Sequence, residues 1–153
     1  MKVALCCGDG LNYHGDWVGF DVVETRFAEG GKQLVLQDVR TIDGYRLRRA
    51  DLIFASPPCT EFSLARVVWH EIGPPDMSVV EACLRIGHEA GVPFVMENVA
   101  GLQQLIGPAT AHRGPWYFWG DVGLLPLGRF PKNVTNRNRN PRRRASIPGA
   151  LVP

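Results

Sequence analysis

The 153-residue sequence predicts one α/β domain built on an open, mostly parallel sheet. Three observations lead to this prediction. Short apolar runs end in turn residues, a longer segment with helical periodicity lies between two of these runs, and polar residues follow where the runs end. Strands that alternate with helices favour a parallel sheet, and ligands bind such sheets beyond the carboxyl ends of the strands. We therefore expect the functional site along that edge.

Five apolar runs are expected to form the strands, because short runs that are hydrophobic on both faces are typical of buried parallel strands. The runs cover residues 3–7, 17–23, 34–36, 52–55 and 92–96. A helix is expected over residues 76–90, where apolar side chains recur with helical spacing and Asp76 or Ser78 is the expected N-cap. Only about nine residues join the first two runs, whereas a crossover that contains a full helix takes a dozen or more.

The composition excludes several classes of protein. A hydrophobic content of 45% and a charged content of 21% are typical of a globular domain. No apolar run approaches the roughly 20 residues of a membrane span, and the N-terminus lacks the pattern of a secretory signal. We therefore expect a cytoplasmic protein whose four cysteines are reduced thiols. No two cysteines have the C-x-x-C spacing of zinc sites, so no metal is expected.

The charge is distributed unevenly, which divides the domain into a body (residues 1–128) and a basic tail (residues 129–153). The net charge is only +2, but seven of the 17 Lys and Arg residues lie in the tail, which has no acidic residue. A basic tail on an acidic body is typical of a phosphate-binding surface, and a solvated terminus is the alternative. The residues expected to contact nucleic acid are Arg137, Arg139, Arg142, Arg143 and Arg144.

Cys59 is the candidate nucleophile. It follows the fourth apolar run in the segment Ser56-Pro57-Pro58-Cys59. Two prolines fix two φ angles, so this loop is stiff and holds the thiol in one place. The polar residues that follow predict an accessible side chain. A free thiol is only a few per cent thiolate at neutral pH, so its neighbours would have to activate it. The alternative is a structural cysteine in a proline turn.

A carboxyl group is expected at the end of the next strand. Glu97 and Asn98 follow the fifth apolar run. A partly desolvated glutamate there would have a raised pKa and would act as an acid or hydrogen-bond donor. The alternative is a glutamate that caps a helix or forms an ion pair.

Together, these two segments resemble the two most diagnostic motifs of the cytosine-5 DNA methyltransferases. The residues that carry the resemblance are Pro57-Pro58-Cys59 and Glu97-Asn98-Val99. The resemblance covers most of the chain and is strongest over residues 51–105. The compact layout, including residues 116–121, looks most like short phage-encoded members, which implies a bacterial host cell as the location.

Other segments are similar to the family's cofactor motifs and to the start of its last motif. They are residues 5–10, 19–23, 37–39 and 147–151. The resemblance implies a truncated Rossmann-like S-adenosylmethionine-dependent methyltransferase fold. Asp21 would accept hydrogen bonds from the ribose hydroxyls, and Asp38 would bind the adenine amino group. The residues implied to bind the cofactor are Cys7, Gly8, Asp9, Gly10, Asp21, Val22, Asp38, Val39 and Pro57.

The resemblance also implies the reaction. Cys59 would add to carbon 6 of a cytosine in DNA, and carbon 5 would then take the methyl group. Glu97 would donate a proton at ring nitrogen 3, and Asn98 would hold the loop. The target base must be flipped out or single-stranded, because a stacked duplex hides the reacting atom. The implied catalytic set is Cys59, Glu97, Asn98, Pro58 and Arg139.

Three features depart from the pattern of the family. The loop after Gly10 is short and lacks most of the first helix. No target-recognition domain fits between Gly120 and Ile147. The family's glutamine-arginine-arginine motif has no clean match in this sequence, although Arg137 and Arg139 have a similar spacing. Sequence specificity would then be slight, or a second copy or a partner subunit would supply it.

Three alternatives are weighed against this interpretation. One is a nucleic-acid-binding relic that keeps the scaffold without turnover, which the short first loop favours. A second keeps the chemistry but acts on tRNA or a pyrimidine nucleotide, and RNA is not separated from DNA by the sequence. A third, a cysteine hydrolase, needs a histidine partner for Cys59, and no motif nominates one. The four histidines are His14, His70, His88 and His112.

Overall fold

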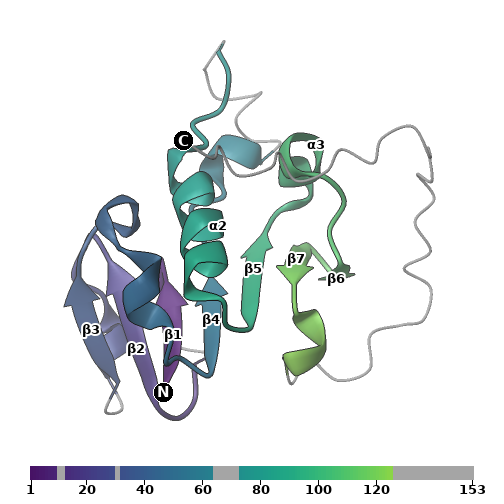
Figure 1. Ribbon diagram of the computed structural model, residues 1–153. Helices are drawn as coiled ribbons and strands as arrows, with labels where there is room; N and C mark the ends of the chain where they lie inside the picture. The colour runs from purple at the N-terminus through teal and green to yellow at the C-terminus, as the bar shows by residue number, and fades with distance from the viewer. Residues whose placement is uncertain (10–12, 30–31, 64–72, 126–153) are drawn as a thin grey trace.

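The computed structural model describes residues 1–9, 13–29, 32–63 and 73–125. Within these ranges, seven strands form one sheet in the order β3-β2-β1-β4-β5-β7-β6 (Figure 1). Strands β1 to β5 are parallel, and β7 runs antiparallel to both of its neighbours. The strands are Lys2–Leu5 (β1), Trp17–Asp21 (β2), Gln33–Leu36 (β3), Leu52–Ala55 (β4), Phe94–Asn98 (β5), Ala111–Arg113 (β6) and Trp116–Gly120 (β7). The prediction of an open, mostly parallel α/β sheet is confirmed.

All five predicted strands form, with ends that differ by up to two residues. β1 stops at Leu5 because Cys6 takes a left-handed conformation, with φ +53°. β2 stops at Asp21, whose carboxylate accepts a hydrogen bond from the backbone N–H of Val22. β5 runs later than predicted and includes Glu97 and Asn98 as its last two residues. β6 and β7 were not predicted as strands.

The predicted helix forms as α2 (Ser78–Ala90), and the prediction of its N-cap was wrong. Met77 occupies the N-cap position, with no side-chain capping bond. The Asp76 carboxylate, one residue earlier, accepts a hydrogen bond from the Ser78 N–H at 2.8 Å, which satisfies one unpaired donor of the first turn. The helix ends at Gly91 in the left-handed conformation that glycine adopts without strain.

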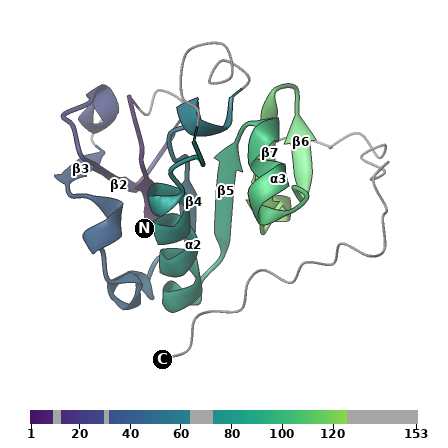
Figure 2. The ribbon, with the colours of Figure 1, turned by 90° about the horizontal axis from the view of Figure 1, so that it is seen from above.

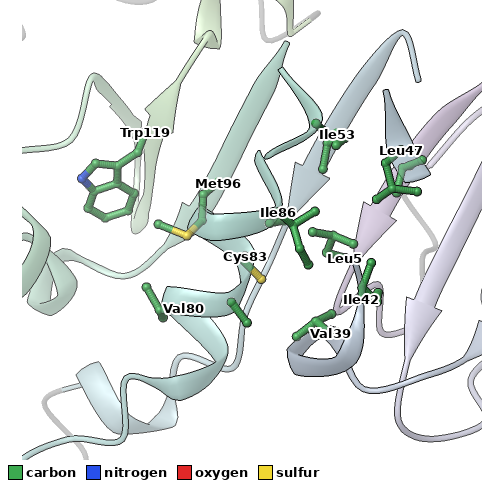
Figure 3. Packing of buried hydrophobic residues seen from close by; sticks show 14 of the residues in the cluster. Leu5, Val39, Ile42, Leu47, Ile53, Val80, Cys83, Ile86, Met96 and Trp119 are labelled. Carbon is green, nitrogen blue, oxygen red and sulfur yellow. The ribbon is translucent and has the colours of Figure 1, made fainter. Parts of the chain in front are cut away.

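One face of the sheet packs against α2. Figure 3 shows Leu5, Ile53 and Met96 of the strands facing side chains of the helix, and Figure 1 shows α2 running along this face. All three strand residues are fully buried. The residues that α2 contributes are Val80, Ala82, Cys83, Ile86 and Ala90, and 3-10 turns add Val39, Ile42 and Leu47. We call this the α2 face.

The opposite face, which we call the second face, is covered differently. Its buried residues include Ala4, Val95 and Phe118. Within the described ranges, 3-10 turns and the segment around Tyr13 pack here in place of an α-helix. The remaining helical segments are α3 (Gln103–Ile106) and the 3-10 turns Arg26–Ala28, Val39–Thr41, Gly44–Leu47, Thr60–Phe62, Ala100–Leu102 and Val122–Leu124.

The strand order fixes where a ligand would bind. From β1 the chain proceeds to β2 and β3 on one side, and then returns to β4 on the other side. This reversal is the topological switch point, where open α/β sheets bind ligands beyond the carboxyl ends of the strands. The edge beyond β1 and β4 is therefore the expected site.

No helix in the described part of the chain is long and apolar enough to cross a membrane. Within the same residues, no three His, Cys, Asp or Glu side chains are grouped so that they could hold a metal ion.

Candidate active site

The loop after β4 presents Cys59 at the switch point. The backbone N–H of Ser56 donates to the carbonyl of Leu5 at 3.0 Å, which continues the pairing of β4 with β1 past the strand end. The chain then passes through two prolines to Cys59, whose side chain is exposed. Phe62 is buried at the end of the following 3-10 turn, so the loop is fixed on both sides of the thiol.

A buried asparagine ties this loop to β5. Asn98 is only 1% exposed. Its side-chain N–H donates to the carbonyl of Pro57 at 2.8 Å, and its side-chain oxygen accepts from the N–H of Val99 at 2.9 Å. Both ends of the amide are therefore satisfied inside the protein, as a buried polar group requires. Asn98 holds the loop that leads to Cys59.

A close backbone contact provides a second tie. Gly101, after the end of β5, lies against Phe62, after the end of β4. A Cβ atom at position 101 would lie 1.9 Å from the carbonyl oxygen of Phe62. Because no side chain fits in that space, the close approach of the two loops requires glycine.

Glu97 lies beside the base of the Cys59 loop. The hydroxyl of Ser56 donates to its carboxylate at 2.8 Å. Burial raises the pKa of Glu97, and the hydrogen bond from Ser56 opposes the shift. A raised pKa favours the protonated form, which is the form that can donate a hydrogen bond or a proton. The sequence predicted this carboxyl position and this direction of the shift.

Cys7 and Cys83, two of the other three cysteines, are buried and poorly suited to be nucleophiles. Burial, followed by the charge of Asp21, raises the pKa of Cys7 to about 12. Cys83 is a fully buried residue of α2, and a hydrogen bond with Cys6 together with burial raises its pKa. The thiolate is the reactive form of cysteine, and apolar burial disfavours it. Cys59 is the exposed cysteine, so it is the best candidate for the nucleophile.

The loop after β1 is joined to the end of β2. The Asp21 carboxylate accepts hydrogen bonds from the N–H groups of Gly8 at 3.0 Å and Val22 at 2.8 Å. Gly8 has φ +51°, and the space beside its Cα is open. Asp9 accepts a bond from the N–H of Arg26 at 3.3 Å. Val22 is 64% exposed, so an apolar surface lies next to a carboxylate.

Asp38 and Val39 are partly occupied by internal contacts. The Asp38 carboxylate caps the turn Val39–Thr41 and pairs with the side chain of Arg40, whose Nε lies 3.0 Å from one carboxylate oxygen. The hydrogen bonds from Arg40 lower the pKa of Asp38. The side chain of Val39 is buried in the core. A ligand would therefore have to share Asp38 with Arg40 and could reach Val39 only through its backbone.

Tyr13 is a candidate site residue that the sequence analysis missed. Its ring lies 4.7 Å from that of Trp17 and 5.9 Å from that of Phe54, measured between centroids. Burial raises the pKa of its phenol, and the charges of Cys7 and Glu97 raise it further. The tyrosine therefore lies between the loop after β1 and the end of β5. No local sequence pattern announces this position, because it depends on the fold of the short connection to β2.

Several predicted site residues lie outside the described residues. They are Gly10, Arg137, Arg139, Arg142, Arg143 and Arg144. The structure brings together the remaining predicted residues along the carboxyl edge of the sheet, in the order Asp38, Asp21, Gly8, Cys59 and Glu97.

Neither a scan against protein families nor a search of curated proteins gives a match to this chain. The functional assignment therefore rests on the geometry of the site and on the motifs in the sequence.

Proposed function

We propose that this protein is an S-adenosylmethionine-dependent methyltransferase that methylates carbon 5 of cytosine in DNA, with Cys59 as its covalent nucleophile. One observation carries the proposal. The proline loop that carries an exposed thiol is tied to the end of β5 by Asn98, and the half-buried Glu97 carboxyl group is bonded to Ser56 at the base of the same loop, at the switch point of an open α/β sheet. Cytosine-5 methylation needs a nucleophile and an acid in this relation.

The chain's own residues account for activation of the base. Cys59 reacts as the thiolate. Its sulfur forms a bond to carbon 6, and the electrons of the double bond between carbons 5 and 6 shift towards ring nitrogen 3. Glu97 in its protonated form donates a proton to that nitrogen, so that negative charge does not accumulate there. Carbon 5 thereby becomes nucleophilic. The raised pKa of Glu97 suits this role, because the acid must hold its proton until the base is attacked.

The residues beyond β1 and β2 fit a nucleoside-containing cofactor in part. Asp21 offers carboxylate oxygens to hydroxyl groups, Val22 offers an exposed apolar surface, and Gly8 leaves room for close approach of a ligand. Asp38 fits less well, because Arg40 already pairs with it. When bound, S-adenosylmethionine supplies the methyl group from its sulfonium to carbon 5.

Release of the product returns the enzyme to its starting state. Carbon 5 loses its proton to solvent, ring nitrogen 3 returns its proton to Glu97, the bond between Cys59 and carbon 6 breaks, and the double bond between carbons 5 and 6 re-forms. The thiolate leaves with the electron pair of that bond. Asn98 keeps the loop in one position through both the addition and the elimination, because its hydrogen bond is made to the backbone of Pro57.

The test is transfer of a labelled methyl group from S-adenosylmethionine to DNA. The protein should label DNA that contains cytosine and should not label the same DNA with 5-methylcytosine in place of cytosine, because carbon 5 is then blocked. Asp21→Asn should weaken cofactor binding in calorimetry while keeping an acceptor for Val22. No cofactor binding at millimolar concentration would contradict the proposal.

One observation favours a second candidate, a nucleic-acid-binding protein without turnover. No α-helix is present in the described part of the connection from β1 to β2, and Asp38 is paired internally. Such a protein would bind nucleic acid equally well with and without cofactor, and would label no DNA. The same chemistry on tRNA or a pyrimidine nucleotide is distinguished by offering those substrates in the labelling assay.

A further inference from the structure

The turn between β6 and β7 lies at the same edge of the sheet as the candidate active site. Asn98, the last residue of β5, pairs with Tyr117 of β7. Because β7 is antiparallel, Trp116 lies one residue beyond the end of β5, and Arg113 pairs with Trp116 across the hairpin. Figure 1 and Figure 2 both show the hairpin on the side of β5 away from α2. The hairpin tip therefore adjoins the segment that follows Glu97 and Asn98.

The exposed side chains of the tip share the second face with Glu97. Glu97 pairs directly with Phe118, and Trp116 lies two residues from Phe118 on the same face. Such diagonal neighbours are about 7–8 Å apart, within reach of an aromatic side chain. Arg113 points to this face too, because it pairs directly with Trp116. Trp116 is 54% exposed, and Arg113 is exposed.

The tip is held in shape from its other face. The rings of His112 and Tyr117 stack at 5.1 Å between centroids, with an angle of 17° between their planes. Gly114 takes φ +58° in the turn, and its missing Cβ would lie 4.0 Å from ring atoms of Trp116. The indole therefore lies against a tight turn that is braced by a cross-strand pair, and its outer surface faces solvent.

An exposed indole beside an arginine is suited to one kind of ligand. Bases of a single strand stack on aromatic side chains, and arginine neutralises the phosphates between them. Two strand spacings, about 10 Å, separate β4 from β7. If the strand keeps the stacked rise of about 3.4 Å per nucleotide, that span equals about three nucleotides, and an extended strand covers it with fewer. A strand whose cytosine reaches Cys59 would therefore extend to Trp116.

We infer that the tip of the β6–β7 hairpin binds single-stranded nucleic acid next to the cytosine that reacts, with Trp116 stacking on a neighbouring base and Arg113 contacting phosphate. The inference rests on the proposed function for the choice of cytosine at Cys59. It assigns a substrate class: a single strand, or a locally opened duplex, is preferred to an intact duplex, because a paired base offers no free face to the indole.

The test measures binding of fluorescent oligonucleotides by anisotropy, with the full chain and without cofactor. The probes are a strand of about 12 nucleotides with one cytosine among thymines, the same sequence as RNA, and the DNA strand annealed to its complement.

Trp116→Ala should weaken binding of the single strand about tenfold or more, whereas Trp116→Phe should stay within about threefold of wild type. Arg113→Ala should reduce the slope of log K against log salt by about 0.7. The DNA and RNA arms show which sugar the surface prefers.

Matched controls lie on the other side of the molecule, in the 3-10 turn Gly44–Leu47 that packs against α2. Tyr45 is 55% exposed and lies in the same 3-10 turn as the exposed Arg46. Tyr45→Ala and Arg46→Ala should leave the affinity and the salt slope unchanged. Circular dichroism verifies that each variant is folded.

Two results would overturn the inference: equal losses in the Trp116 and Tyr45 variants, or tighter binding of the intact duplex than of the single strand. Methyl transfer to duplex DNA that is unaffected by Trp116→Ala would leave the proposed function standing and remove the inference alone. If binding depends on Trp116 but no methyl group is transferred, the inferred binding surface stands and the proposed methyltransferase function is contradicted.

Discussion

At the scale of the residue, Glu97 combines partial burial with a titratable group. Burial raises its pKa, so the folded protein holds this proton more tightly than the unfolded chain does. Stability therefore falls as pH rises through the raised pKa, and the full cost of burying the charge is present above it. Below the ordinary pKa, both states are protonated and the cost disappears.

Glu97→Gln should therefore stabilise the protein while it impairs the reaction. The amide cannot ionise and still accepts a hydrogen bond from Ser56. We expect a higher Tm than wild type at about pH 8, a difference that vanishes towards about pH 4, and a strong loss of methyl transfer with near-normal cofactor binding. Thermal melts across this pH range measure the first effect. Glu24→Gln, at an exposed site, is the control and should show no such trend. A lower Tm for Glu97→Gln at about pH 8 would contradict this account of Glu97.

Which individual residues can be predicted depends on how local their surroundings are. The exposure of Cys59 follows from the polar residues and prolines next to it, and the structure confirms it. The pairing of Arg40 with Asp38 depends on a 3-10 turn that the sequence does not announce. The position of Tyr13 could not be predicted, because its ring packs against Trp17 of β2 and Phe54 of β4. These contacts form only once the strands have assembled into the sheet.

At the scale of the element, the proposed active site depends on two loops being held together. Gly101→Ala places a methyl group against the carbonyl of Phe62, where no space exists. We expect a destabilisation of about 1–3 kcal/mol in denaturant unfolding, together with lower methyl transfer, because the Cys59 loop must shift. Gly123→Ala is the control, since its Cβ would meet nothing within 4 Å. If the two variants unfold at the same denaturant concentration, the close contact between the loops does not stabilise the fold.

Strands and helices could be predicted where apolar residues recur with a regular spacing or form a run with clear ends. The strands β1 to β5 are short apolar runs between turn residues, and α2 has a continuous helical stripe. β6 has only three residues, and its pairing with β7 forms a hairpin whose aromatic strand shows no alternation. The end of β5 was misplaced for a related reason. Glu97 and Asn98 are polar, yet they continue the ladder with β7.

At the scale of the whole molecule, the sheet order brings the candidate residues together. Asp21, Gly8, Cys59 and Glu97 are spread over some 90 positions of the sequence, but their strands are neighbours with aligned carboxyl ends. The parallel arrangement could be predicted from the apolar runs, and its consequence for ligand binding follows from the switch point. The order of the strands in the sheet could not be predicted from the sequence, because it depends on how the segments that connect the strands pack.

The basic tail contributes to nucleic-acid binding if its arginines contact phosphates. A variant that ends at Gly128 should bind DNA more weakly and with a shallower salt dependence than the full chain, because counterion release scales with the number of phosphates neutralised. Affinity measured at several salt concentrations tests this. Equal slopes for both proteins would show that the tail is only a solvated terminus.

Trapping of a covalent adduct tests the central claim most directly. Fluorine at carbon 5 of cytosine cannot leave as a proton, so the bond between Cys59 and carbon 6 cannot break after transfer. DNA that carries 5-fluorocytosine should therefore give a shifted band on a denaturing gel when S-adenosylmethionine is present. Cys59→Ser should give no band, because a hydroxyl is far less ionised than a thiol, whereas Cys6→Ser, Cys7→Ser and Cys83→Ser should each keep it. A band of equal intensity from the Cys59→Ser protein would show that Cys59 is not the nucleophile.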